Sequence, residues 1–244
     1  NIECMDDQHR EYSAAQRGTT DTPDETEKVS VVAVSPGDGV ATIFRDFGAA
    51  NILAGGDTMN PSVRQALNAI KSAPSQAVIF LPNNQNVVPA ARQAAQLADK
   101  LVSVVPSSTV PQGIAAMLEF NPKLGVEENT AAMDLAITRV RTGEVCDAVR
   151  EVNLNGVPVR KGQAIGLLER ELVAAEETPG EALLILMGSA NVKDGDLVTL
   201  YWGGDVAEPD ACKAHAALQN EFPNIEFDVV YGGQPHYYYI VSIE

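Results

Sequence analysis

The sequence is poor in cysteine, and the few cysteines are scattered. Cys4, Cys146 and Cys212 are odd in number and form no CxxC pair. A disulfide-bonded scaffold in an oxidising compartment needs a denser, even-numbered set. We therefore expect the protein to reside in the cytoplasm.

Long hydrophobic runs are also missing. The longest, such as residues 182–187, fall far short of the roughly 20 apolar residues that span a bilayer. No basic segment followed by apolar and small residues opens the chain, as a secretion signal would. We do not expect the chain to span a membrane. It begins with Asn1 rather than Met, so we expect it to be a piece of something longer.

Basic residues are few. The 244 residues include 17 Lys and Arg against 33 Asp and Glu, which gives a formal net charge of −16. DNA, RNA and anionic membranes are bound through basic side chains, so this composition argues against all three. Apolar residues make up 45% of the chain, which is ordinary for a globular protein with a sizeable core.

Sequence signatures of catalysis are absent. There is no GxxxxGK[ST] phosphate loop, no HExxH or HxH spacing for zinc, and no GxSxG elbow. The three histidines, His9, His215 and His236, lie far apart in the sequence, and Gly37-Asp38-Gly39 is only a fragment of a dinucleotide-binding motif. The sequence therefore offers no catalytic residue and no metal ligands, and it leaves open whether the chain is an enzyme.

From Val29 onward, strand patterns alternate with helix patterns. Continuous β-branched runs predict buried strands, and the apolar-periodic segment after each predicts a helix. Asn60 is the predicted cap of the second helix, with Pro61 at its first position. This alternation predicts a parallel, doubly wound α/β sheet. The predicted strands are 29–35, 51–56, 77–82 and 101–106, and the helices lie around 40–47, 61–70, 87–98 and 112–120.

The pattern changes after Asn121-Pro122. One longer helix is predicted over residues 126–141, an extended strand over 144–154, and a hairpin turn at Asn155-Gly156. Further short strands and two helices follow. We therefore expect a mixed α+β subdomain over 123–244, after a parallel α/β subdomain over 29–122. Residues 1–28 are interpreted as a leading helix and an acidic linker from a preceding domain, the alternative being a dangling tail.

Small and polar residues follow every strand of the predicted parallel sheet. Ligands of such sheets bind beyond the carboxyl ends of the strands, where glycine permits close approach and amides and hydroxyls supply hydrogen bonds. The alternative is that these residues only cap helices and close turns. The candidate binding residues, for a partner or a ligand, are Gly55, Gly56, Thr58, Asn60, Ser62, Asn83, Asn84, Asn86, Thr109 and Gln112.

Four tyrosines surround a Gly-Gly-Gln-Pro turn near the C-terminus, at residues 231–239. Tyrosine suits a β-strand, and it also anchors protein interfaces, so both interpretations stay open. The candidate interface residues are Gln234, His236 and Tyr237.

Five segments resemble, in order, the C-terminal domain of the catalytic subunit of bacterial fatty acid kinases, which are related to the dihydroxyacetone kinases. They are GGDTMNPS (55–62), LPNNQNV (81–87), VVPSSTVPQGIAAMLEFNP (104–122), TGEVCDAVREV (142–152) and YGGQPHYYYIVSIE (231–244). IECMDDQH (2–9) resembles the stretch that joins this domain to the kinase middle domain. The resemblance covers essentially the whole chain from Val29 onward.

The resemblance implies a DegV-like fold and a division of labour. In that family an N-terminal domain binds ATP and magnesium, and a middle domain contributes to the active site and to dimerisation. The C-terminal domain docks a separate DegV-like subunit that carries a fatty acid, whose carboxylate is phosphorylated for phospholipid synthesis. The resemblance thus implies no cofactor in this chain, with ATP and Mg on an upstream domain.

The resemblance also implies partners: the fatty-acid-carrying DegV-like protein, the upstream kinase domains, and a second copy through those domains. In the carrier, small hydroxyl residues at the matching strand ends hold the carboxylate. Thr58, Ser62 and Thr109 occupy comparable loop positions in this chain.

Two functions are consistent with these residues. The leading hypothesis is a non-catalytic domain that docks the fatty acid carrier for upstream kinase domains. The alternative is that the strand-end cleft around Gly55, Thr58, Asn83 and Thr109 itself binds a small carboxylate or a fatty acid. An independent hydrolase would need a nucleophile and a base within hydrogen-bond reach, which a sequence cannot show.

Overall fold

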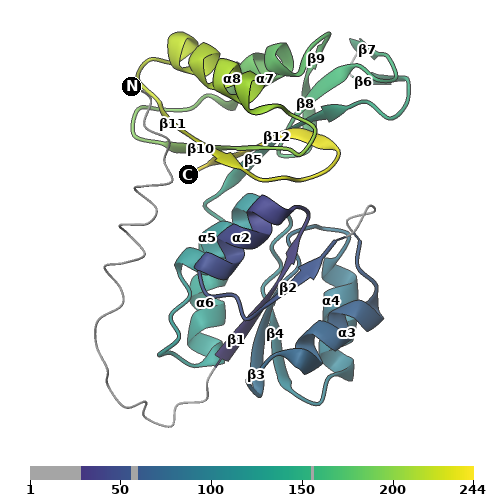
Figure 1. Ribbon diagram of the computed structural model, residues 1–244, viewed down its shortest axis with the longest axis vertical. Helices are drawn as coiled ribbons and strands as arrows, with labels where there is room; N and C mark the ends of the chain where they lie inside the picture. The colour runs from purple at the N-terminus through teal and green to yellow at the C-terminus, as the bar shows by residue number, and fades with distance from the viewer. Residues whose placement is uncertain (1–28, 56–59, 155–156) are drawn as a thin grey trace.

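The computed structural model describes residues 29–55, 60–154 and 157–244 (Figure 1). Three sets of predictions fall outside these residues: the leading helix and linker of 1–28, the candidate binding residues Gly56 and Thr58, and the turn at Asn155-Gly156.

Four parallel strands form the first sheet, sheet A, in the order β2-β1-β3-β4. Every residue of the two central strands is buried, as continuous β-branched runs predict for strands covered on both faces. The predicted parallel α/β fold is therefore confirmed. The strands are β1 (Val29–Ser35), β2 (Asn51–Ala54), β3 (Ala77–Leu81) and β4 (Leu101–Val104).

Helices cover both faces of sheet A. On one face, Phe44 and Met117 bury against Val31 of β1. On the other, Ile70 buries against Phe80 of β3. The first face is covered by α2 (Asp38–Asp46), α5 (Val110–Leu118) and α6 (Val126–Ile137), and the second by α3 (Val63–Ser72) and α4 (Val88–Leu97).

Helix α3 begins two residues later than its sequence predicts. Ser62 is its N-cap, with the Gln65 amide N–H donating to the Ser62 hydroxyl at 3.3 Å and the Ser62 N–H donating to the Gln65 side chain at 2.9 Å. This reciprocal capping box starts the helix at Val63. Asn60 and Pro61 therefore precede the helix rather than open it.

Helix α6 packs against sheet A, although its sequence lies in the half assigned to the second subdomain. Met133 and Ile137 belong to the same buried cluster as Val31 and Ile79. The chain therefore passes from one sheet to the other just after Ile137, and not near residue 122. The helical pattern of 126–137 could not show which sheet its apolar side would cover.

The second sheet, sheet B, has six strands in the order β11-β10-β12-β5-β8-β9. Only β10 and β11 are parallel, and the other neighbours are antiparallel, so the mixed sheet predicted for the second half is confirmed. The strands are β5 (Arg141–Asp147), β8 (Ala164–Leu168), β9 (Glu171–Glu176), β10 (Leu197–Trp202), β11 (Glu226–Tyr231) and β12 (Tyr237–Ile243).

Two helices and a small hairpin complete the second half. Helices α7 (Pro179–Ala190) and α8 (Glu208–Glu221) bury Leu186 and Leu218 against sheet B. The single strand predicted over 144–154 is instead two: the end of β5, and β6 (Val152–Leu154), which pairs with β7 (Val157–Val159).

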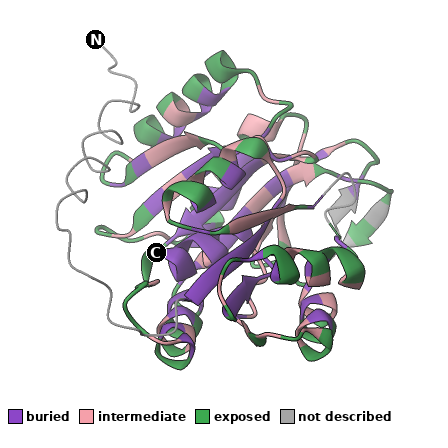
Figure 2. Ribbon diagram, turned by 60° about the horizontal axis from the view of Figure 1, so that its bottom comes forward, coloured by how far each residue is buried: buried purple, intermediate pink, exposed green. Residues whose placement is uncertain are grey.

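Sheet B also packs on the helices of sheet A. Tyr201 and Ile240 of sheet B share a buried cluster with Val40 of α2 and Ile114 of α5. Figure 1 shows α2 and α5 directly beneath sheet B, and Figure 2 shows buried residues running through the strands of both sheets. No helix among the described residues is long and apolar enough to cross a membrane.

Candidate functional site

The candidate binding loops lie where the carboxyl ends of the sheet A strands face sheet B. These strands are parallel, so the loops after β1, β2, β3 and β4 gather at one edge, here called the rim. At the rim, Gly37 lies against Gly233, and the Val40 N–H donates to the Gly232 carbonyl at 3.0 Å. An amide in the first turn of α2, which could bind an anion, is thus bonded to the segment that follows β11 of sheet B.

Asn83 joins three segments of the rim. Its side-chain amide donates to the Val34 carbonyl at 2.8 Å and accepts from the Ser107 hydroxyl at 2.7 Å. Its backbone N–H donates to the same hydroxyl at 3.1 Å. Its φ of 53° is left-handed, which asparagine tolerates better than most residues. Because Asn83 is only 4% exposed and these groups bond one another, it holds the strand ends together.

Thr109 and Gln112 also bond within the protein. The Thr109 hydroxyl accepts from the Gln112 N–H at 3.4 Å as the N-cap of α5, and lies 2.8 Å from the Thr142 hydroxyl of sheet B. The Gln112 side-chain oxygen accepts from the Ser108 N–H at 2.7 Å. Thr109 therefore caps α5 and bridges the rim to β5, whereas the Gln112 side chain bonds within its own loop.

The turn between β8 and β9 adds a further bridge to the rim. Glu169 and Arg170 have φ values of 48° and 72°, as in a tight two-residue hairpin turn. The Arg170 guanidinium donates to the Gln85 side chain, and the Thr142 N–H donates to the Glu169 carboxylate. The turn thus connects sheet B to the loop after β3.

The remaining predicted rim residues are placed as follows. Gly55 is buried, and its N–H donates to the Ser35 carbonyl at 2.9 Å. The Asn84 side chain accepts from the Asn86 N–H at 2.9 Å. Asn60, Ser62 and Asn86 are exposed. The structure thus brings Asn83, Thr109 and Gln112 together at the rim, and leaves Asn86 exposed.

The three candidate interface residues differ in exposure. Gln234 is fully buried and donates to the Tyr201 carbonyl at 2.9 Å, so it is out of reach of a docking partner. Tyr237 is half-buried against the shared core, and His236 is exposed with a φ of 68°. Of the four tyrosines, Tyr231 ends β11 and is exposed, and the other three begin β12.

A partly buried group of titratable side chains lies on β5 and β12 beside the rim. Burial raises the pKa of Glu144, which the charge of Arg170 partly offsets. Burial also raises the pKa of Tyr237, with the nearby Glu144 charge acting in the same direction. Burial, reinforced by the charges of Glu144 and Asp147, raises the pKa of Cys146 to about 11.

We predict that Cys146 reacts slowly with alkylating reagents. Only the thiolate reacts, and its fraction at pH 7.5 should be about 100-fold below that of an ordinary exposed thiol. The greater nucleophilicity of a more basic thiolate offsets part of this, so the rate should be about tenfold lower and rise toward pH 10. Mass spectrometry after iodoacetamide treatment of a Cys4→Ser variant measures this, with Cys212, exposed on α8, as the internal comparison. Equal labelling of Cys146 and Cys212 at pH 7.5 would contradict the burial of this thiol.

Catalysis could use an activated hydroxyl at the rim or a bound metal ion. The Ser107 hydroxyl donates to an amide oxygen, which is not a base that could activate it. Within the described ranges, no group of three or more His, Cys, Asp or Glu side chains could hold a metal ion.

Sequence reasoning missed several residues that organise the rim, above all Ser107, Gly113, Thr142 and Arg170. A Cβ at Gly113 would overlap the Asn83 side chain, so this glycine makes room for the network. The paired serines after β4 were a weak signal for Ser107. Arg170 gave none, because its partner lies 85 residues away in sequence.

Comparison with known proteins agrees with this architecture. The family of FakA-like fatty acid kinase proteins, through its C-terminal domain, matches residues 30–244. The chain belongs to this family. Protein YloV of Bacillus subtilis is 36% identical over 245 residues, and an uncharacterized Staphylococcus aureus protein is 31% identical over 243. Each match covers 100% of this chain but 44% of the relative, so this FakA-like domain spans less than half of their length.

Solved structures share the fold of this FakA-like domain at low sequence identity. A DegV family protein from Corynebacterium glutamicum matches 89% of this chain and 96% of its own, with a TM-score of 0.63 and 16% identity. A Thermotoga maritima protein described as having a fatty acid binding function matches 90% of this chain and 99% of its own, with a TM-score of 0.62 and 12% identity. The dihydroxyacetone kinase of C. freundii matches 88% of this chain and 48% of its own, with a TM-score of 0.58 and 12% identity. The DegV-like fold is therefore confirmed.

Proposed function

We propose that this chain is the non-catalytic C-terminal domain of an ATP-dependent fatty acid kinase. In this role it docks a fatty-acid-carrying DegV-like subunit, so that upstream domains phosphorylate the acyl carboxylate. The observation that carries the proposal is the family match over residues 30–244. ATP and magnesium would bind an upstream domain, and a homodimer would form through upstream domains.

The hydrogen bonding at the rim favours docking over ligand binding. Asn83 and Ser107 bond one another, and Asn83 also bonds the end of β1. Gln112 bonds within its own loop, and Thr109 bonds sheet B, so these groups are already engaged. A partner can instead contact exposed positions such as Asn86.

We expect saturable one-to-one binding when the chain is titrated with the DegV-like proteins of its own organism loaded with fatty acid. Asn86→Arg should weaken binding about tenfold if the rim docks the carrier, because an unpaired charge would be buried at the interface. Gln96→Arg introduces the same charge on α4 and should bind normally. Isothermal titration calorimetry measures both.

Failure to bind any such carrier would remove the docking function. If the partner presents a basic face to this acidic chain, the association rate should also fall as salt rises. Association rates that do not change with salt would indicate a mainly apolar contact.

A second candidate is fatty acid binding by this chain itself. It is favoured by the likeness to the Thermotoga maritima protein with a fatty acid binding function. Fatty acid that co-purifies with the chain, combined with failure to bind a carrier, would support it.

A further inference from the structure

Strand β2 forms an open edge of sheet A. Among the described residues, it pairs only with β1. An edge strand presents unpaired backbone N–H and C=O groups that can bind another strand, and natural edges are often blocked by charge or proline. β2 is Asn51-Ile52-Leu53-Ala54 and has neither. Its outer backbone is therefore able to pair.

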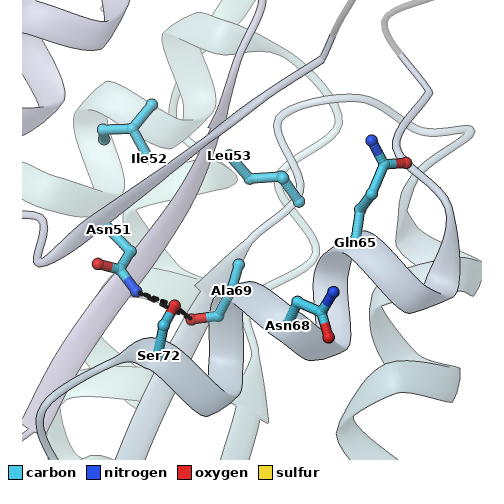
Figure 3. Close-up of a pocket in the computed structure, with 7 residues that line it drawn as sticks. All are labelled: Asn51, Ile52, Leu53, Gln65, Asn68, Ala69 and Ser72. Atoms are coloured by element: carbon cyan, nitrogen blue, oxygen red, sulfur yellow. Dashed lines mark hydrogen bonds between the residues drawn. The ribbon is translucent and has the colours of Figure 1, made fainter.

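A groove of about 480 Å³ follows this edge, between β2 and helix α3 (Figure 3). The Asn51 side chain donates to the Ala69 carbonyl at 2.9 Å and to the Ser72 hydroxyl at 3.0 Å, which ties the start of β2 to the end of the helix. Gln65 and Asn68 line the helix side and are exposed. The groove thus offers a strand edge with a polar wall beside it.

We propose that residues 19–22 of the acidic linker occupy this edge as an added antiparallel strand. Three of these four residues are threonine, which favours strands, and Pro23 then ends the pairing. The proposal is independent of which partner the domain docks.

The length of the linker fits this placement. Residue 28 leads directly into β1, the neighbour of β2, so the added strand would lie two strand spacings, about 10 Å, from β1. Val29 lies three residues before Val32, the partner of Asn51, which adds about 10 Å along the strand direction. The six residues 23–28 can span about 20 Å, so they can connect the two strands.

The charges of the linker and of helix α3 also favour the linker as the segment bound at this edge. Residues 18–28 contain four acidic residues and one lysine, whereas α3 carries Arg64 and Lys71 and no acidic residue. Spacings of four and three place Arg64, Asn68 and Lys71 on one face of the helix, next to the groove. The salt bridges between described residues involve neither Arg64 nor Lys71. These cations are therefore available to attract the linker.

Hydrogen exchange of the full chain tests the proposal. In a strand, the N–H groups of successive residues point to opposite sides, so one of residues 20 and 21 would face β2. A double variant with Thr20→Pro and Asp21→Pro removes that N–H in either register. We expect the outward-facing β2 amides to exchange about tenfold faster in this variant than in the wild type. The amides of β4, the other edge of the same sheet, should be unchanged and serve as the control.

A charge variant tests the attraction separately. Arg64→Gln with Lys71→Gln should also speed β2 exchange, whereas Arg92→Gln on α4 should not. Equal β2 exchange in the wild type and the proline variant would overturn the proposal. Protection that depends on protein concentration would assign the edge to a second copy, and protection that appears only with added carrier would assign it to that partner; each would also overturn it.

Discussion

Replacing Gly39 by alanine is expected to lower the free energy of unfolding by about 3 kcal/mol, because the added methyl group has no room. A Cβ there would lie 2.9 Å from a backbone carbon of Gly232 and closer still to the Tyr231 carbonyl oxygen. The hydrogen bond from Val40 to Gly232 holds these atoms in place, so sheet B would have to move away from α2. Urea unfolding measures the loss.

Gly188→Ala is the matched control. Gly188 lies on the exposed side of α7, and a Cβ there meets nothing within 4 Å. This substitution should stabilise the domain by about 0.5–1 kcal/mol, the usual gain of alanine over glycine within a helix. If Gly39→Ala were as stable as the wild type, the close contact between α2 and sheet B would be wrong.

Asn83→Ala is expected to lower the free energy of unfolding by about 3–5 kcal/mol. The substitution removes both side-chain hydrogen bonds, leaves the buried Ser107 hydroxyl and Val34 carbonyl without this partner, and places a Cβ-bearing residue at a left-handed φ that asparagine tolerates better. Ser107 is fully buried, so water cannot readily replace the lost partner. Equilibrium unfolding by circular dichroism measures the change.

Asn83→Gly separates the two causes. Glycine adopts the left-handed conformation without strain, so this variant should be about 1 kcal/mol more stable than Asn83→Ala. The exposed Asn86→Ala should change stability by less than about 0.5 kcal/mol. If Asn83→Ala lowered the free energy of unfolding by less than about 1 kcal/mol, the hydrogen bonds of Asn83 would not hold the strand ends together.

Local sequence patterns were sufficient to predict the first sheet. The β-branched runs at β1 and β3 predicted central strands because burial on both faces demands continuous apolar side chains. The alternation with helices then required parallel strands, which placed the candidate loops on one edge of the sheet. The clustering of Asn83 and Thr109 follows from that geometry.

The sequence could not show what those side chains bond to. Asn83 meets Val34 and Ser107 across 49 and 24 residues, and Arg170 meets Gln85 across 85. The Asn83 contacts depend on the order of the strands in sheet A, and the Arg170 contact on how the two sheets face one another; no local spacing encodes either. For the same reason, the position of α6 and the burial of Gln234 appear only in three dimensions.

The place of β12 within sheet B has a consequence for how this half of the chain is made. β12 joins two groups of strands, β11-β10 on one side and β5-β8-β9 on the other, and it follows all of them in the chain. During synthesis the two groups therefore remain separate, with unpaired edges on β10 and β5, until residues 237–243 leave the ribosome. A chain cut before Tyr237 would keep both edges exposed, which is the condition under which β-strands aggregate.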